Sequence, residues 1–154
     1  MVEKKRYYED CELNEDFISP GRTITEADIF FYSALSSDYS ELHTNAEYAR
    51  QTIFKERIAH GMLGLTIVQG LEIRAGIDRI AGVASLGWTW DFRAPIRIND
   101  TLHSRFTLKN KRLTHKKGLG ILYLCGQLVN QNEQVVQEGE HRLMVETREA
   151  ERNI

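Results

Sequence analysis

The segment from His60 to Arg74 constrains the fold most strongly, because its apolar residues do not keep to one face. Its first turns, His60-Gly61-Met62-Leu63-Gly64-Leu65-Thr66-Ile67-Val68, are apolar or small on nearly every side of a helix. Such a helix cannot lie on a solvated surface, so we predict that it is buried. Gly61, Gly64 and Gly70 each cost the helix about 1 kcal/mol relative to alanine. We therefore expect another backbone or a ligand to approach the helix closely at these glycines.

From Leu86 onward, the period of the apolar residues changes to two. Leucine, tryptophan and phenylalanine alternate with polar or small residues as far as Phe92, which indicates a half-buried strand that Pro95 closes. Short polar loops separate the later segments and favour antiparallel neighbours. A buried helix followed by long strands predicts an α+β fold in which the sheet curls around the helix. The later β segments are Leu102 to Lys111, Leu119 to Val129 and Val135 to Thr147.

Two shorter helices are expected before residue 60. Thr25 can cap the first of them, and Asp28 at its third position can return the capping hydrogen bond. Polar residues at 36–40 then form turns and end this helix. The second helix begins at Thr44, where Glu47 completes another capping box. Apolar residues recur at helical spacing in the first helix and are expected to face inward: Ala27, Phe30, Phe31, Ala34 and Leu35.

Charge and composition exclude several classes of function. The 20 lysines and arginines nearly balance the 22 aspartates and glutamates, and no basic field of the kind that binds nucleic acid results. No apolar stretch reaches the ~20 residues that span a bilayer, and no secretory signal is recognisable. We expect a single domain over residues 1–154, located in the cytoplasm, with no nucleic-acid or membrane partner. Cys11 and Cys125 lack metal-ligand spacing and disulfide density, so they are interpreted as thiols without assigned chemistry.

Asp38 and His43 are candidates for acid–base chemistry. They are five positions apart, which on a continuous helix turns them about 140° away from each other. Because Asp38 falls in the predicted break, a loop can fold its carboxylate beside the imidazole, so that both reach one water within ~2.6–3.2 Å. Alternatively, Asp38 is only a turn residue and His43 flanks a helix and bonds a backbone carbonyl. Spacing alone favours this second interpretation.

The start of the buried helix offers a possible oxyanion site. The first N–H groups of a helix have no intrahelical acceptor and carry the positive end of the dipole, so a carbonyl oxygen could dock on the Gly61 amide. Alternatively, Gly61 merely lets a strand pass close to the helix, which is the better interpretation of the glycine by itself. We interpret His60 as an orienting or capping residue rather than a catalyst.

At this point the residues form a pattern that resembles a known family. The first block is Asp38-Tyr39-Ser40-Glu41-Leu42-His43-Thr44-Asn45, followed by Tyr48-Ala49, Phe54 and Arg57-Ile58-Ala59-His60-Gly61-Met62. Later blocks are Phe92-Arg93-Ala94-Pro95-Ile96, Asp100-Thr101-Leu102 and Val136-Gln137-Glu138-Gly139. In this combination the chain resembles the MaoC-like, (R)-specific enoyl-CoA hydratase family.

The resemblance implies a hotdog fold, in which a long antiparallel sheet wraps a central helix, and a homodimer or dimer of dimers. It also implies that Asp38 and His43 form a catalytic dyad and that the Gly61 amide holds a thioester carbonyl. Two residues depart from the family pattern. Glu41 replaces a common proline and puts a carboxylate near the dyad, where an inward orientation would raise the pKa of both partners. Asn45 replaces a common aspartate and is expected to change only local hydrogen bonding.

The implied activity is reversible syn addition of water to a trans-2-enoyl-CoA, giving a (3R)-3-hydroxyacyl-CoA. No metal or redox cofactor is expected, and coenzyme A enters as part of the substrate. Arg57, Arg93 and Arg97 are candidates for contacts with its phosphates. Two alternatives remain: a hotdog acyl-CoA thioesterase, in which Asp38 directs water to the carbonyl, and a non-catalytic acyl-CoA-binding subunit. The substrate-binding residues expected around the acyl chain are Tyr39, Leu42, Phe54, His60 and Met62.

Overall fold

The computed structural model describes residues 5–151 of the chain. Its helices and strands follow the order that the sequence predicts, with helices dominating the first half and strands the second. In order they are η1 (Tyr8–Asp10), β1 (Asp16–Ile18), β2 (Arg22–Thr23), α1 (Glu26–Ser36), α2 (Glu41–Thr44), α3 (Ala46–Gln51), α4 (Gly61–Arg74), η2 (Ile77–Arg79), β3 (Gly82–Phe92), β4 (Thr101–Leu113), β5 (Leu119–Val129), β6 (Val135–Glu146) and α5 (Arg148–Glu151).

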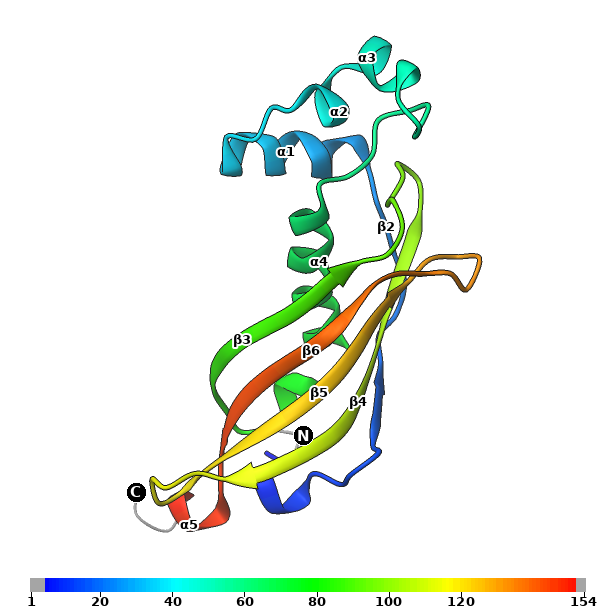
Figure 1. The fold of residues 1–154 in the computed structure, drawn as a ribbon. Coiled ribbons are helices and arrows are strands. Elements are labelled where there is room, and N and C mark those ends of the chain that lie inside the picture. Colours follow the sequence, from blue (N-terminus) through cyan, green and yellow to red (C-terminus); the bar gives the residue numbers. More distant parts are fainter. Residues whose placement is uncertain (1–4, 152–154) are drawn as a thin grey trace.

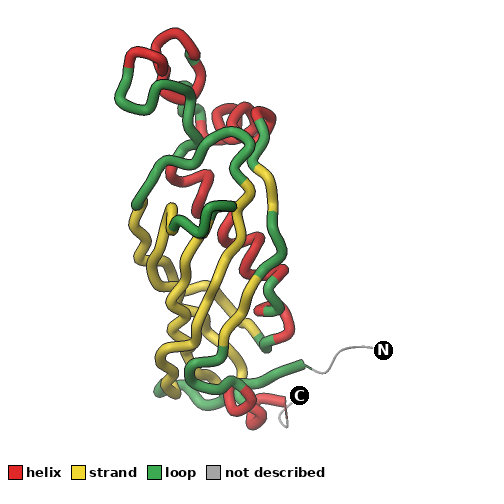
Figure 2. The backbone as a smooth tube through the Cα atoms, turned by 90° about the vertical axis from the view of Figure 1, so that its right-hand side faces the viewer, coloured by secondary structure: helices red, strands yellow, loops and turns green. Residues whose placement is uncertain are grey.

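The strands form an antiparallel sheet in the order β1-β4-β5-β6-β3, and β2 makes a short additional pairing with β4. In Figure 1, α4 runs along one face of this sheet, and the small helices α1 to α3 gather near the start of α4. The view of Figure 2 shows the long strands following the length of that helix. The predicted α+β arrangement, with a curved antiparallel sheet around a central helix, is therefore confirmed.

The core lies between α4 and the inner face of the sheet. Leu63, Ile67, Val68 and Leu71 are buried along one side of the helix. They pack in one cluster with residues such as Phe106 on β4. Burial of this apolar surface fixes α4 against the strands and holds the start of the helix near one end of the sheet.

The far side of α4 differs from the prediction. Met62 and Ile73 are 53% and 48% exposed, and Gly70 has no atom within 4 Å of where a Cβ would stand. The expectation of burial on every side is therefore wrong, because a single sheet covers only one side of the helix. Close approach does occur at Gly61 and Gly64, but from side chains and not from the expected backbone or ligand: an added Cβ would lie 2.4 Å from the Phe92 ring and 2.3 Å from the Gln137 amide.

Helix α1 begins as predicted and packs in a different way. The Thr25 N–H donates to the Asp28 carboxylate at 2.7 Å, so the capping box is confirmed. The buried residues of α1 are Ile29 and Ser33. The residues that were predicted to face inward are exposed, so that prediction is wrong. The reason is that α1 lies across the end of α4 and does not cover the sheet (Figure 1). The exposed members are Ala27, Phe30, Phe31, Ala34 and Leu35.

The second predicted helix corresponds to α3, its predicted cap is one residue off, and the short helix α2 before it was not predicted. The Asn45 side chain caps α3 by accepting from the N–H groups of Glu47 and Tyr48, each at 3.1 Å. The Thr44 hydroxyl instead donates back to carbonyls within the preceding turn. Thr44 therefore ends α2, and the predicted capping box with Glu47 is wrong.

Strand β3 is longer than predicted and forms an edge of the sheet. Trp88 and Trp90 are half-buried against the core, but Leu86 and Phe92 are exposed.

Cys11 is buried, Cys125 is half-buried, and both are free thiols. Over residues 5–151, no helix has the length and apolar character needed to cross a membrane.

Candidate active site

The turn after α1 brings Asp38 toward His43. Ser37 adopts a left-handed conformation with φ 61° and ends the helix, so the chain reverses direction. The Asp38 carboxylate then accepts the Ser40 N–H at 3.1 Å, in the kind of turn that short polar residues form. His43 follows on α2. Because the helix is interrupted between them, the two side chains can lie close together despite their unfavourable helical spacing.

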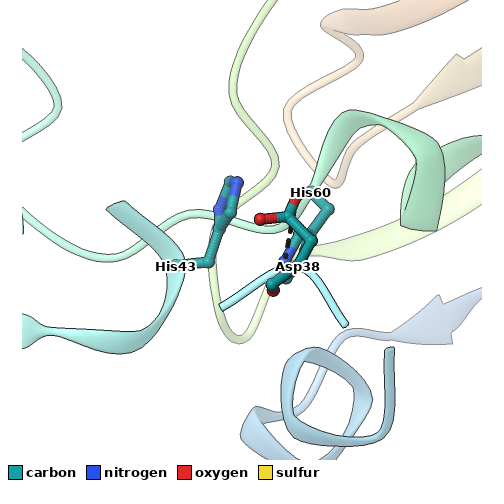
Figure 3. Close-up of side chains that lie close together, drawn as sticks. All are labelled: Asp38, His43 and His60. Atoms are coloured by element: carbon teal, nitrogen blue, oxygen red, sulfur yellow. Dashed lines mark hydrogen bonds and ion pairs between the residues drawn. The ribbon is translucent and has the colours of Figure 1, made fainter. Parts of the chain in front are cut away.

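Asp38, His43 and His60 gather at this turn (Figure 3). Each offers one side-chain oxygen or nitrogen within 4.8 Å of those of the other two. The structure thus brings together the two residues expected as a dyad and adds a second imidazole beside them. The Asp38 side chain remains 52% exposed, so solvent can reach the carboxylate.

One hydrogen bond fixes the orientation of the His43 ring. Its Nδ1 lies 2.8 Å from the carbonyl oxygen of Ile58. Because a carbonyl oxygen only accepts, Nδ1 carries the proton and donates. In the neutral ring, Nε2 is therefore the nitrogen with a free lone pair, so His43 can accept a proton from water at that atom.

His60 stabilises the turn that carries Asp38. It is 3% exposed, and its Nε2–H donates to the backbone carbonyl of Asp38 at 3.0 Å. Its ring lies 3.8 Å from the His43 ring, measured between centroids. Burial lowers the pKa of His60, so the neutral form is favoured. These contacts suit an orienting role for His60, although its Nδ1 has no hydrogen-bond partner among the described residues.

Two cavities meet at His43. One, of about 410 Å³, is mainly apolar and is lined by Ile29, Phe30, Phe31 and Tyr39 among others. The second cavity, of about 320 Å³, is lined by Phe54, Gly61, Phe92, Pro95 and Gln137, among others, in addition to His43. His43 lines both, so its imidazole and the first residue of α4 face a common space.

The expected substrate-binding residues are placed unequally. Tyr39 lines the apolar cavity and Phe54 the second one, whereas His60 lies buried beneath the turn. Leu42 and Met62 line neither of these two cavities. The structure therefore brings only part of the expected acyl wall to the site.

Gln137 is a residue of the site that the sequence did not indicate by itself. It is 1% exposed; its Nε2 donates to the Gly61 carbonyl at 2.9 Å, and its Oε1 accepts from the indole N–H of Trp90 at 2.9 Å. This chain of hydrogen bonds fixes the first residue of α4 against the sheet. The residue appeared only within the Val136-Gln137-Glu138-Gly139 block, because a glutamine in a strand carries no signal of its own.

The two departures from the family pattern lie away from the dyad. Glu41 is exposed and accepts a hydrogen bond from the Asn45 side chain at 3.1 Å. The carboxylate therefore has a partner at the N-cap of α3, and Glu41 lines neither of the two cavities. Asn45 itself has the local role expected of it, as the cap of that helix.

The candidate arginines already have carboxylate partners. Arg57 pairs with Glu26, and Arg97 pairs with Glu56. Arg93 pairs with two carboxylates on the strands beside it. An incoming phosphate would compete with these ion pairs, most of which are partly exposed and therefore weak.

The donor set could also be considered for a metal. Two imidazoles and a carboxylate are ligands that transition metals accept. However, the Nε2 of His60 and the Nδ1 of His43 already donate to carbonyls. Apart from the buried His60 Nδ1, the atoms free to act are the His43 Nε2 and the Asp38 carboxylate, a pair suited to moving protons to and from water.

A family model described as "MaoC like domain" matches residues 12–123 of the chain. The chain belongs to this family. A curated relative, the (R)-specific enoyl-CoA hydratase of Rhodospirillum rubrum, is 33% identical over 145 residues, which cover 92% of this chain and 93% of the relative. Protein MaoC of Klebsiella aerogenes is 32% identical over 114 residues, or 73% of this chain, and this match spans only 33% of that longer protein.

Solved structures share the fold of this MaoC-like chain. One from an Archaeoglobus species, described as a monoamine oxidase regulatory protein, is 26% identical with a TM-score of 0.90, over 96% of this chain and 98% of that one. A Mycobacterium tuberculosis protein described as a double hotdog fold has a TM-score of 0.81 at 17% identity, over 93% of this chain and 44% of that one. This likeness shows the fold, and the MaoC-like chain described here has the hotdog architecture.

Proposed function

We propose that this MaoC-like protein adds water reversibly to trans-2-enoyl-CoA thioesters and forms (3R)-3-hydroxyacyl-CoA. The observation that carries the proposal is the convergence of the Asp38 carboxylate and the His43 imidazole beside a cavity that Gly61 also lines. Several relatives are named as hydratases or dehydratases, which supports hydro-lyase chemistry for this chain.

The reaction begins with polarisation of the substrate. The thioester carbonyl accepts a hydrogen bond from the Gly61 amide, whose position as first residue of α4 leaves it without an intrahelical acceptor. This bond and the positive end of the helix dipole stabilise negative charge on the oxygen. Electron density leaves the double bond, and the β-carbon becomes electrophilic.

Water is then activated between the two side chains. Asp38 removes a proton from a water molecule that it shares with His43, and the oxygen bonds to the β-carbon. Asp38 passes this proton to the free Nε2 of His43, and His43 supplies it to the α-carbon. The thioester thus gains one hydroxyl and one hydrogen, and the dyad returns to its original protonation state. No group other than the dyad is required to move protons.

Binding of the substrate uses the two cavities. The apolar cavity beside Tyr39 and Phe30 suits an acyl chain, because moving hydrocarbon out of water lowers the free energy. Coenzyme A is bound as part of the substrate, and its phosphates attract exposed cations near the site. We also propose a homodimer or a dimer of dimers, because apolar side chains stay exposed on α1 and on the far side of α4.

One assay separates this activity from its alternatives. Purified protein is mixed with crotonyl-CoA, and both the absorbance of the conjugated thioester and the release of free thiol are followed. We expect loss of the conjugated absorbance without thiol. Thiol release would instead indicate a thioesterase. If the absorbance stays constant and no thiol is released, a non-catalytic acyl-CoA-binding subunit or a different acyl group is favoured.

A further inference from the structure

Gln137 joins β6 to the start of α4 beside the proposed site. Its direct partner in the sheet is Phe92 on the neighbouring strand β3. Both side chains reach the first residue of α4. The Phe92 ring occupies the space where a Cβ of Gly61 would stand, and the Gln137 amide donates to the Gly61 carbonyl at 2.9 Å. The residue that offers the proposed oxyanion donor is therefore held from the sheet.

Trp90 fixes which way the Gln137 amide points. The indole N–H of Trp90 lies 2.9 Å from Gln137 Oε1, and an indole nitrogen can only donate. The amide oxygen therefore faces Trp90, and the NH2 group faces the Gly61 carbonyl, which can only accept. Gly139 makes room for this contact, because it is paired with Trp90 in the sheet and an added Cβ would lie 2.7 Å from the indole ring.

Packing alone does not account for a glutamine at position 137. Gln137 is 1% exposed, so its amide has lost its contacts with water. A buried amide destabilises the fold unless it is hydrogen-bonded, and a long side chain loses rotamer freedom when it is ordered. A methionine would fill a similar space without the polar group. The hydrogen bonds to α4 and to β3 are therefore what distinguishes this residue from an apolar one.

The start of α4 needs such a contact because its first residue is a glycine. A glycine backbone has more accessible conformations than that of any other residue, and the first N–H groups of a helix have no intrahelical partner. An oxyanion donor works at about 2.7–3.1 Å from the developing charge, and a misplacement of about 1 Å can lower the rate by roughly 10². The Gln137 amide also lies against Gly64, so it spans the turn that begins with Gly61.

We propose that Gln137 is a positioning residue for the oxyanion donor, an inference that rests on the proposed hydration. Through the Gly61 carbonyl it holds the first turn of α4, so that the Gly61 N–H points at the thioester oxygen as negative charge develops there. Trp90 keeps the donating end of the amide directed at α4. Loss of Gln137 should therefore lower the turnover number more than it changes KM, because the charge on the oxygen is greatest in the transition state.

The kinetic test compares Gln137→Met with the wild type in crotonyl-CoA hydration. Methionine has a similar length but cannot donate to the Gly61 carbonyl, so the turnover number should fall roughly tenfold or more. Trp90→Phe keeps an aromatic ring without the N–H and should cause a smaller loss. The matched control is Gln127→Met: this glutamine lies on β5, donates to Glu138 at 3.2 Å and does not line the cavity of Gly61. It should keep the wild-type turnover number.

The carbonyl band of bound crotonyl-CoA separates positioning from a merely structural role. A hydrogen bond lowers the stretching frequency of a carbonyl, so isotope-edited infrared spectroscopy of the 13C-labelled thioester reports its contact with the Gly61 amide. Asp38→Asn serves as the background, because it should bind the thioester and turn it over slowly. Adding Gln137→Met to this background should raise the frequency towards that of the free thioester, and adding Gln127→Met should leave the frequency unchanged.

Circular dichroism and thermal unfolding establish that each variant is folded. Folded Gln137→Met with the wild-type turnover number, or with a lower turnover number and an unmoved carbonyl band, would overturn the role of Gln137. If this variant does not fold, the turnover number and carbonyl band of Trp90→Phe decide in the same way. If the wild type does not hydrate crotonyl-CoA, the proposed function fails, whereas the carbonyl band, measured without turnover, still shows whether Gln137 orients the Gly61 amide.

Discussion

His60 connects the turn that carries Asp38 to the beginning of α4. Its Nε2–H donates to the Asp38 carbonyl, and its ring packs against His43. A change at this one residue therefore alters the position of both proposed catalytic groups. Burial also makes His60 sensitive to pH, because it lowers the pKa in the folded protein and leaves the unfolded chain at the ordinary value.

The first prediction concerns this pH dependence. Below the ordinary imidazole pKa of 6.5, the unfolded chain binds a proton at His60 more readily than the folded protein does. The free energy of unfolding should therefore fall as the pH drops below that value and should be fully recovered above it. His60→Gln keeps a side-chain N–H for the Asp38 carbonyl and does not titrate. Urea unfolding above and below this pH should show a weaker dependence in the variant.

The comparison between wild type and His60→Gln isolates this histidine, since the other histidines are present in both proteins. An equal pH dependence in the two would show that His60 titrates alike in the folded and unfolded states. The turn would then have to be held by contacts other than the buried imidazole.

At the scale of the elements, the contact between α4 and the sheet depends on where glycines occur. Gly64 lies where the Gln137 side chain crosses the helix, and Gly70 lies on the uncovered side. The same substitution at these two positions should therefore have opposite effects. Gly64→Ala adds a Cβ 2.3 Å from the Gln137 amide and should destabilise the protein by about 1–3 kcal/mol.

Gly70→Ala is the matched control. No atom lies within 4 Å of its added Cβ, so the gain in helix propensity should stabilise the protein by up to about 1 kcal/mol. Thermal or urea unfolding of the two variants measures the difference. Changes of the same sign and size would contradict the packing of α4 described above.

Sequence patterns predicted the elements better than the surfaces that cover them. The strands could be placed because alternation and polar loops mark them locally, and Thr25 with Asp28 marks the start of α1 in the same way. The exposure of Phe31 on α1 could not be predicted from the sequence, because helical periodicity identifies an apolar face but not which element, if any, packs against that face. Thr44 and Asn45 are both good caps, and only the turn of α2 decides between them.

The candidate site was predictable to a similar extent. Asp38 and His43 are close in sequence, so a break between helices was enough to suggest their meeting. The hydrogen-bonded series of Ser85, His141 and Glu72 elsewhere in the fold could not be found in this way. His141 is 56 residues from Ser85 and 69 from Glu72, and only the strand register and the packing of α4 join them.

At the scale of the whole molecule, the uncovered faces of α1 and α4 predict self-association. Leu35 and Ile73 are 84% and 48% exposed, and isolated hotdog units with such surfaces would leave much apolar area in water. The chain has a mass of 17.8 kDa, so light scattering after size exclusion should give at least twice that value. A mass of 17.8 kDa at micromolar concentration would contradict the proposed dimer.

The proposed hydration depends above all on the Asp38 carboxylate acting with His43. The most direct test is the turnover number for crotonyl-CoA hydration in Asp38→Asn, with His43→Ala beside it and Glu41→Gln as a matched control on the exposed neighbouring carboxylate. Both dyad variants should lose roughly 10² or more in turnover while circular dichroism stays unchanged, and the control should keep the wild-type rate. Wild-type turnover in folded Asp38→Asn would contradict the proposed mechanism.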